Sequence, residues 1–570
     1  MNWSPASVVT LAGDTIQADS AWLTVPMRHA KPGGPTIQLP VLRVRSSASR
    51  QGSPIIYLAG GPGNSGIAAL RDPDRGPLLT ALRDLGDVIL YDQRGTGRSR
   101  PSVLIPTSLG LPTDRSIADS SVISEAANRL RPYLDSLRQS GVDLDAYNTA
   151  ESADDVEALR LALGVERVTL WGHSYGSHLT FAVLKRHGNR VDRAIVGGVN
   201  GLHQRWRLPS DGDTWIARID SAIKADTSLR HLVPDLTGSL RALLAKLDRE
   251  PMRATAGNRT VLVSGDEVRI FLALQSGDIA LAGRLPLIVA QLSSGDASRF
   301  APELLRTLHN RPVGPAMTYT MHYASGVDAA RARRIESEAP QAILRNAINY
   351  PFDIAEFRAL WNVTDLGPEF RAPVTTNVPT LFLSGSIDRR TSISDAEEIR
   401  NGFSRSAHVV IDGAGHNFYT STPAVLARMR AFLTEGTLRN EHLRARFVPR
   451  GPEEPRLVAE LRETVLRDGA DAATKRLEAI ARSQTEHLTE FVLGTASVLL
   501  ANEDKRPELA IALATSGSSL FPESTFLLDR LGEWKAASGD ASGARTAWTR
   551  ALQLDPYDSF AASQLKKLPR

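Results

Sequence analysis

Three residues that could together activate a serine occur in this chain in the order Ser, Asp, His. Ser174 lies in the middle of GHSYG, residues 172–176, where a run of β-formers gives way to a helical pattern. Asp388 follows the apolar run TLFL, and His416 stands in a glycine-rich loop after the apolar run VVI. A serine hydroxyl is a poor nucleophile until a positioned histidine takes its proton, and that histidine needs an anionic partner. The pattern predicts acyl transfer with Ser174 as nucleophile, His416 as base and Asp388 as its partner.

The turn around Ser174 is expected to be strained. A G-x-S-x-G turn between a strand and a helix forces the serine backbone into an unfavourable conformation, and the flanking glycines avoid Cβ clashes. Such strain costs about 1–3 kcal/mol and persists mostly where a site needs it. Among the 12 histidines, His173 lies inside this turn, while His178 and His187 lie on the following helix. We expect these three to be structural.

Two other carboxylates could in principle serve the histidine. Asp395 and Asp412 both follow Ser174 in the chain and lie between Asp388 and His416. Asp412 is very near His416 in a tight loop, whereas Asp388 stands just beyond the end of a strand, where open α/β sheets hold their sites. We therefore favour Asp388.

A tetrahedral oxyanion needs preorganised N–H donors. The backbone of Tyr175, directly after the nucleophile, should supply one of them. The second should come from the glycine-rich loop AGGPG, residues 59–63, which follows a short apolar strand. Proline has no N–H, so Gly61 is the expected donor, with Gly60 or Gly63 as alternatives.

The elements around these residues alternate between strand and helix. This alternation, after two N-terminal strands, predicts a mostly parallel sheet with an antiparallel edge. Strands are expected at Trp22–Met27, Thr36–Val44, Pro54–Leu58, Val88–Tyr91, Arg167–Trp171, Arg193–Val196, Thr380–Leu383 and His408–Ile411. Helices are expected at Glu125–Arg138, Asp154–Leu163, His178–His187 and Pro423–Thr434.

The strand pattern is interrupted once and is then followed by a helical region. Residues 202–375 show helical periods and almost no strand signal, so we interpret them as a cap inserted between two parts of one core, 1–201 and 376–440. The alternative is an independent domain. Residues 453–570 read as helix upon helix, and Pro522 and Pro556 are 34 residues apart, the tetratricopeptide period. We interpret this tail as a short degenerate repeat array, or else as an ordinary helical tail.

Composition excludes several classes of function. The chain has 570 residues, a net charge of +4 and no cysteine, and its basic residues are interleaved with acidic ones. These features predict no nucleic-acid-binding surface and no thiolate site. The histidines are scattered and no dinucleotide fingerprint occurs, so the sequence predicts neither a metal nor a cofactor. No apolar run is long enough to span a membrane, and the N-terminus lacks a signal-peptide pattern. As written, the chain is expected in the cytoplasm, or in the periplasm or medium if a leader was removed.

Taken together, three motifs resemble those of the proline iminopeptidase branch of the α/β-hydrolases, including its larger tripeptidyl-aminopeptidase-like members. They are GGPG at 60–63, DQRGTGRS at 92–99 and GHSYG at 172–176, and the match covers roughly residues 18 to 435. The resemblance implies an α/β-hydrolase fold with a mostly parallel eight-stranded sheet, a helical cap and a Ser174–Asp388–His416 triad. It also implies cap carboxylates that hold the α-amine of a substrate, for which Glu336, Glu338, Asp353 and Glu356 are candidates.

Three functional hypotheses follow. The leading one is a serine aminopeptidase that removes N-terminal residues, proline or other, from short peptides or arylamides through an acyl-enzyme. The second keeps the triad but makes the chain an esterase or amidase for a hydrophobic small molecule. Its pocket could be lined by tryptophans of the cap, namely Trp206, Trp215 and Trp361, although a role in the cap core is favoured. The third is a binding protein in which the helical tail mediates homo-oligomerisation or holds a protein partner.

Overall fold

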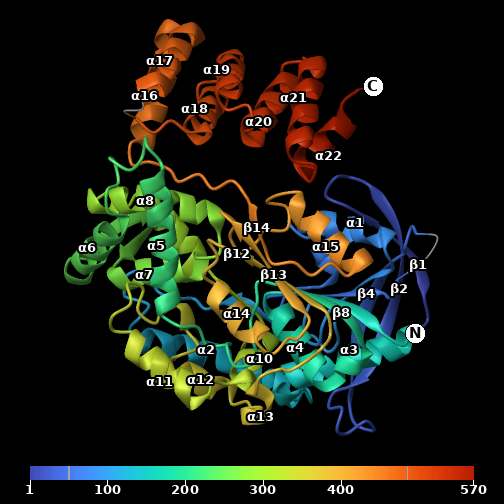
Figure 1. Cartoon of the computed structure of the whole chain (residues 1–570). Helices are drawn as coiled ribbons and strands as arrows, with labels where there is room; N and C mark the ends of the chain where they lie inside the picture. The colour runs from blue at the N-terminus through green and yellow to red at the C-terminus, as the bar shows by residue number, and fades with distance from the viewer. Residues whose placement is uncertain (49–51, 484–485, 570) are drawn as a thin grey trace.

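A single large sheet forms the centre of the molecule (Figure 1). The computed structural model describes residues 1–48, 52–483 and 486–569. Within them the sheet has ten strands in the order β1-β2-β3-β5-β4-β7-β8-β12-β13-β14. Their bounds are β1 Ser4–Val9, β2 Thr15–Pro26, β3 Thr36–Val44, β4 Ile55–Leu58, β5 Val88–Tyr91, β7 Val168–His173, β8 Val191–Gly197, β12 Thr380–Gly385, β13 Ser406–Asp412 and β14 Glu441–Arg444.

The sheet is mostly parallel, as the sequence predicts. From β5 across to β14 every neighbouring pair is parallel, while β1, β2 and β3 pair antiparallel at one edge. All eight predicted strands are present, but the predicted count of eight is wrong because β1 and β14 extend the two edges. Both are mostly exposed, and the sequence of β14, EHLR, carries almost none of the apolar signal that marks a buried strand.

Helices cover both faces of the sheet and bury its apolar strands. One face packs against α1 (Gly76–Ala81) and α15 (Ala424–Glu435), and the other against α3 (Thr149–Leu163), α4 (Tyr175–His187) and α14 (Ile393–Arg400). Strands covered on both sides read as continuous apolar runs, which is why β4, β5 and β12 were predictable.

The inserted segment is mainly helical but is not free of strands. Its helices are α5 Ser210–Ala225, α6 Leu236–Arg249, α7 Gly265–Gln275, α8 Ile279–Ser293, α9 Phe300–Leu304, α10 Met317–Ser325, α11 Ala329–Glu338, α12 Ala355–Trp361 and α13 Gly367–Arg371. It also contains a hairpin, β9 (Met252–Ala256) and β10 (Arg259–Val263), and β11 (Pro312–Pro315) pairs with β6 (Leu104–Ser108). The near-absence of strands expected here is therefore wrong. The strands were missed because they are only four or five residues long and partly exposed.

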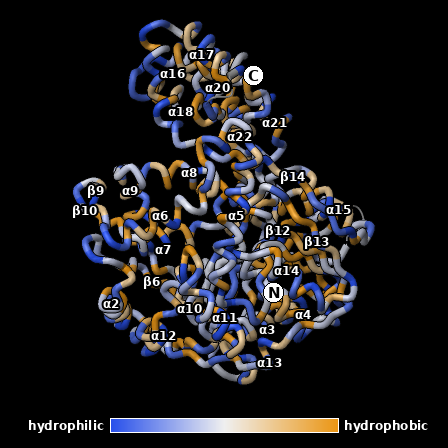
Figure 2. The backbone as a smooth tube through the Cα atoms, turned by 60° about the vertical axis from the view of Figure 1, so that its left-hand side comes forward, coloured by the Kyte–Doolittle hydropathy of each residue, from blue (hydrophilic) through white to orange (hydrophobic). Residues whose placement is uncertain are grey.

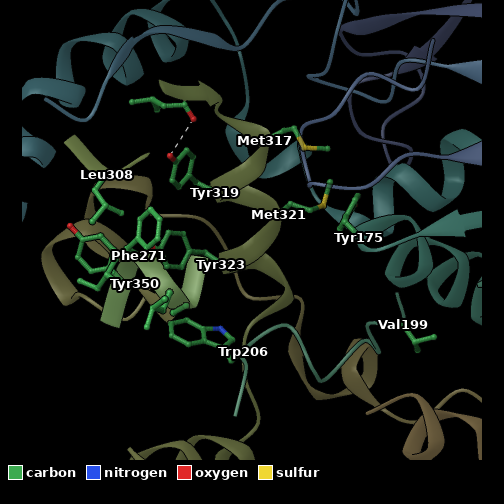
Figure 3. Packing of buried hydrophobic residues seen from close by; sticks show 14 of the residues in the cluster. Tyr175, Val199, Trp206, Phe271, Leu308, Met317, Tyr319, Met321, Tyr323 and Tyr350 are labelled. Carbon is green, nitrogen blue, oxygen red and sulfur yellow. Dashed lines mark hydrogen bonds between the residues drawn. The ribbon is translucent and has the colours of Figure 1, made fainter. Parts of the chain in front are cut away.

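The cap shares an apolar core with the sheet. One continuous cluster of buried side chains contains strand residues such as Leu170 together with cap residues such as Met321 and Trp361. Figure 3 shows Met321 of α10 beside Tyr175 of α4, and Thr149 Oγ1 lies 3.0 Å from the Met321 sulfur. The cap also packs on α2 (Ser120–Gln139), whose Arg138 Nη2 donates to the Trp361 carbonyl at 3.2 Å. The cap is thus fixed to the sheet by buried contacts.

The C-terminal region is all-helical, as predicted, and stands apart as a lobe in Figures 1 and 2. Its buried apolar side chains form clusters separate from those of the sheet and cap, whereas the partly buried Tyr557 packs against the sheet cluster. It meets the rest of the chain through Arg446 and Glu490 (Nη2–Oε2 2.8 Å), through His487 and Ser228 (Nδ1–Oγ 2.8 Å), and through Lys566. Its helices are α16 Glu454–Asp468, α17 Ala470–Ser483, α18 Glu490–Asn502, α19 Pro507–Leu520, α20 Thr525–Ala537, α21 Ala541–Leu554 and α22 Ser559–Lys567.

The last full helix pair, α20 and α21, keeps the small-against-large packing on which the repeat interpretation depends. A Cβ on Gly532 would lie 2.5 Å from Trp548 Nε1, so that position accepts only glycine while the indole stays where it is. None of the helices in the described part of the chain is both long and apolar enough to cross a membrane.

Candidate active site

Ser174 occupies the strained turn that the sequence predicts. It lies between β7 and α4 with φ 57° and ψ −120°, a left-handed φ that few non-glycine residues adopt. The turn is also crowded, because a Cβ on Gly176 would lie 1.9 Å from the Leu58 carbonyl oxygen and one on Gly172 2.2 Å from the Gly176 oxygen. The glycines allow the turn to pack closely against β4, and Ser174 lies at the carboxyl end of the sheet.

Asp388 and His416 come together across two neighbouring strands. Asp388 follows β12 and His416 follows β13, and His416 Nδ1 lies 2.7 Å from Asp388 Oδ2. The backbone N–H of His416 donates to the Gly277 carbonyl of the cap at 2.8 Å, which fixes the loop that carries the ring. Because Asp388 accepts at Nδ1, the proton of a neutral His416 lies there and Nε2 is left as the base.

Asp388 is held as a charged acceptor. Its side chain is buried, and besides His416 it accepts hydrogen bonds from Thr391 Oγ1 at 2.5 Å and from the Arg390 N–H at 2.8 Å. Burial alone would raise the pKa of Asp388, but the neighbouring His416 and these hydrogen bonds outweigh it, so the pKa is lowered. The carboxylate therefore stays ionised beside the imidazole.

The alternative acids lie elsewhere. Asp412 is bonded to His442 (Oδ2–Nδ1 3.0 Å), and Asp395 is buried beside Arg331 (Oδ1–Nη2 3.3 Å). Among the described residues only Asp388, of these three carboxylates, contacts His416. The geometry favours the acid that the strand-end argument selects.

The other histidines of this region have structural surroundings. His178 is buried between the Gly201 carbonyl and Ser325 Oγ, and His187 contacts Asp154. The His173 ring packs 4.8 Å from the His416 ring and against two aromatic rings of the next segment. Burial, then the nearby Arg75 and His416, lower the pKa of His173 well below its ordinary value, so His173 is neutral.

The glycine-rich loop after β4 lies directly against Ser174. A Cβ on Gly60 would sit 3.2 Å from the Cβ of Ser174, and Gly61 adopts φ +108°, a conformation that glycine tolerates. Gly60, Gly61 and Gly63 line the same cavity as Ser174, and Tyr175 is the first residue of α4. Both expected oxyanion donors, the N–H groups of Gly61 and Tyr175, thus belong to segments that flank Ser174.

The segment 92–99 holds this loop in place, a role that the sequence did not reveal. Gln93 Nε2 donates to the Ala59 carbonyl at 3.1 Å, and Asp92 Oδ1 accepts from Ser65 Oγ at 2.5 Å. Arg94 is fully buried and forms two bonds with Asp155, at 2.7 and 2.6 Å. The sequence did contain an indication of this role, because polar residues that directly follow a buried strand are themselves buried and need hydrogen-bond partners.

A cavity of about 980 Å³ opens above Ser174 and His416. We call its lining residues within 57–97, 173–174 and 390–417 the core wall, and those within 205–352 the cap wall. The cap wall contains Leu274, Ile348 and Phe352, and the Phe352 ring stacks on His322 at 3.8 Å. The cavity has the size of a site for a small molecule or short peptide.

The cap carboxylates proposed as amine ligands do not line this cavity. Glu336 and Glu356 are exposed, Glu338 is paired with Arg334 (Oε1–Nε 2.6 Å), and Asp353 Oδ2 accepts from Asn346 Nδ2 at 2.7 Å. Assigning them to the substrate amine was an expectation that the geometry does not support. The three tryptophans considered for the pocket are buried in the shared core instead: Trp206, Trp215 and Trp361.

Arginine is the charged residue that the sequence analysis missed. Six arginines line the cavity, whereas Asp72 is the only carboxylate in the lining found among the described residues. They come from five separate segments of the chain, so no local sequence motif predicts that they lie together. The set is Arg75, Arg205, Arg207, Arg306, Arg311 and Arg390.

Comparisons with known proteins agree with this architecture. Residues 53–263 match the family model described as alpha/beta hydrolase fold, and residues 356–444 match the one described as TAP-like protein. The tripeptidyl aminopeptidase of Streptomyces lividans is 30% identical over 250 residues, which cover 40% of this chain and 46% of that protein. The proline iminopeptidase of Xylella fastidiosa is 25% identical over 228 residues, which cover 40% of this chain and 52% of that protein.

A solved structure, that of the proline iminopeptidase of Mycobacterium smegmatis, aligns with 16% identity and a TM-score of 0.33, covering 73% of this chain and 98% of that one. The chain spans about half the length of the two curated relatives described above.

Proposed function

From the premise that this chain is an α/β-hydrolase with a TAP-like second part, we propose that it is a serine hydrolase with a Ser174–His416–Asp388 triad. Its leading substrates are short peptides or arylamides, cleaved near the N-terminus through an acyl-enzyme. The observation that carries the proposal is the 2.7 Å contact between His416 Nδ1 and Asp388 Oδ2, because His416 and the strained Ser174 line the same cavity.

The mechanism follows from the positions of these groups. Ser174 Oγ attacks the scissile carbonyl while His416 Nε2 takes the hydroxyl proton, and Asp388 stabilises the imidazolium that forms. The N–H groups of Tyr175 and Gly61 receive the oxyanion of the tetrahedral intermediate. His416 then gives its proton to the leaving amine or alcohol, which departs and leaves an acyl-Ser174. A water molecule, deprotonated by His416, attacks this ester, and Ser174 regains its proton as the acid product forms.

The substrate class rests on the relatives, whose names include tripeptidyl aminopeptidase and proline iminopeptidase. One observation favours a second candidate, an esterase or amidase acting on a small molecule. The lining contains no carboxylate, among the described residues, that is free to bind an α-amine, since Asp72 is paired with Arg75 (Oδ2–Nη2 2.6 Å).

The test compares the purified protein with Ser174→Ala on alanyl or prolyl p-nitroanilide and on p-nitrophenyl butyrate. We expect turnover of at least one substrate, and its loss in the variant. Arylamide turnover selects the aminopeptidase, and ester turnover alone selects the second candidate. Ser298→Ala, at an exposed cap position away from the cavity, is the matched control and should retain full activity. Full activity in Ser174→Ala would refute the mechanism.

The interaction role of the helical tail remains a prediction. None of the cavity-lining residues that the structure describes belongs to 453–570, so the tail does not complete the site. Measuring the solution mass by light scattering tests whether the chain forms homo-oligomers, as the third hypothesis expects.

A further inference from the structure

Arg205, which is partly buried and lines the cavity, has neutral partners where an arginine removed from bulk water normally has a carboxylate. Its Nε donates to His322 Nδ1 at 3.1 Å, and its Nη1 donates to Asn200 Oδ1 at 3.3 Å. Within the described part of the chain no Asp or Glu comes within ion-pair distance of it. Arg94 shows the contrast, since that buried guanidinium has two bonds to Asp155. A charge that is even partly removed from water without a counter-charge is unfavourable, so the arrangement needs a reason.

Arg207 lies beside it and is also incompletely paired. Its Nη1 is 3.8 Å from Asp395 Oδ2 but is buried without a hydrogen-bond partner among the described residues. The backbone of Arg207 is held from both sides by Asn349, whose Oδ1 accepts from the N–H and whose Nδ2 donates to the carbonyl, each at 2.9 Å. The residue is therefore positioned firmly while its guanidinium keeps a free donor.

His322 adds a third unused donor at this place. Because its Nδ1 accepts from Arg205, which has no acceptor capacity of its own, the proton of a neutral His322 must lie on Nε2. That Nε2 is buried and has no hydrogen-bond partner among the described residues. His322 lines the cavity together with Arg205 and Arg207.

The two arginines also oppose each other electrostatically. Burial, and next the like charge of Arg207, lower the pKa of Arg205 below its ordinary value. Burial likewise lowers the pKa of Arg207, although Asp395 offsets part of the effect. Holding two cations close in a low-dielectric site is unfavourable until an anion lies between them, because the anion pairs with both.

We propose that the substrate of this hydrolase carries an anionic group, a carboxylate or a phosphate, which Arg205, Arg207 and His322 bind while the scissile bond lies at Ser174. The inference rests on the proposed function and adds the charge of the substrate to it. Guanidinium groups suit this task because their planar donors match carboxylate and phosphate oxygens. The apolar patch of Ile348 and Phe352 accommodates the uncharged part of the molecule.

The test uses three esters that differ in charge. p-Nitrophenyl butyrate is the neutral reference, p-nitrophenyl hydrogen glutarate places a carboxylate on the acyl side, and 3-carboxy-4-nitrophenyl butyrate places one on the leaving group. We expect at least one anionic ester to exceed the neutral one in kcat/KM by about tenfold or more, as for a desolvated charge-assisted contact. Succinate and inorganic phosphate, tested as competitive inhibitors, distinguish a carboxylate site from a phosphate site.

Variants assign the preference to its residues. Arg205→Gln and Arg207→Gln should each lower the ratio of anionic to neutral kcat/KM by about tenfold, mainly through KM, and Arg205→Lys should restore part of it. Arg334→Gln, which removes an exposed cap arginine outside the cavity, is the matched control and should keep the ratio of the parent protein.

The outcomes separate this inference from the proposed function. Ser174-dependent hydrolysis of the neutral ester, with no anionic preference and no inhibition by either anion, would overturn the inference and leave the hydrolase standing. A preference that survives in both Arg→Gln variants would overturn it as well. The absence of Ser174-dependent turnover on any ester or arylamide would instead count against the proposed function.

Discussion

The core wall and the cap wall of the cavity are built in opposite ways. Along the core wall the charged groups are partnered: Arg75 pairs with Asp72, and Asp388, which does not itself line the cavity, accepts from the wall residue His416 and from Thr391. On the cap wall, Arg205 has only neutral acceptors and Arg207 keeps an unpartnered nitrogen. Hydrogen-bonded charges are held in fixed positions, as a catalytic site requires. Cations without a counter-charge can instead pair with an anionic ligand.

This difference suggests separate roles for the two walls, the chemical step for the core wall and substrate selectivity for the cap wall. In the proposed mechanism the core wall can act on any acyl group that reaches Ser174, since the backbone donors, Ser174 and His416 contact only the reacting atoms. In the same proposal the cap wall contacts the remainder of the substrate and determines which molecules bind. Substitutions on the two walls should therefore affect different kinetic parameters, which gives four predictions.

The largest effect is expected from Asp388→Asn. The amide cannot stabilise the imidazolium and favours the wrong tautomer of His416, so kcat should fall by about 10³- to 10⁴-fold on neutral and anionic substrates alike. Steady-state kinetics on p-nitrophenyl butyrate measures it. Asp412→Asn, which touches His442 and not His416, is the control and should stay near the parent rate. Equal losses in both variants would remove Asp388 from the triad.

A smaller effect is expected from Gln93→Met, a change at a residue that contacts the core wall through Ala59 without lining the cavity. The side chain keeps its volume but loses the hydrogen bond to the Ala59 carbonyl, so the glycine-rich loop shifts relative to Ser174. Misplaced oxyanion donors should lower kcat by about 10- to 100-fold with little change in KM. An unchanged kcat in a variant of normal thermal stability would show that Gln93 does not position the loop.

On the cap wall, Arg306→Gln should change selectivity only modestly. Arg306 is exposed, so water and salt screen its charge far more than those of Arg205 and Arg207. We expect the anionic-to-neutral ratio of kcat/KM to fall by about two- to threefold, and by less at high salt. A loss as large as that of Arg205→Gln would place the anion at the mouth of the cavity instead.

The smallest effect is expected from Glu336→Gln and Glu356→Gln. Both carboxylates are exposed and neither lines the cavity, so kcat/KM on alanyl p-nitroanilide should change by about twofold or less. A large rise in KM for the free amine, with no change for p-nitrophenyl butyrate, would return amine recognition to the cap carboxylates.

The core wall could be predicted from sequence because its constraints are local. The glycines around Ser174 mark a turn that other residues cannot enter, and Asp388 and His416 follow buried strands whose apolar runs are plain. The eight predicted strands were found for the same reason. The edge strands β1 and β14 were not predicted because mostly exposed strands carry a weaker apolar signal.

The cap wall could not be predicted because it depends on contacts between distant segments. Arg205 meets His322 across 117 positions, and Arg207 meets Asn349 across 142. The sequence RWR at 205–207 does not indicate whether either arginine has a carboxylate partner. The short strands of the cap were missed similarly, since β11 is defined by its pairing with β6 and not by its own four residues.

The central claim, that Ser174 is the activated nucleophile of this site, can be tested most directly by covalent labelling. The full-length protein is treated with a fluorophosphonate, and the modified peptide is identified by mass spectrometry. The account predicts a single adduct on Ser174, its loss in Ser174→Ala and strongly slowed labelling in Asp388→Asn. An adduct on another serine that persists in Ser174→Ala, in a protein that hydrolyses its substrate, would contradict it.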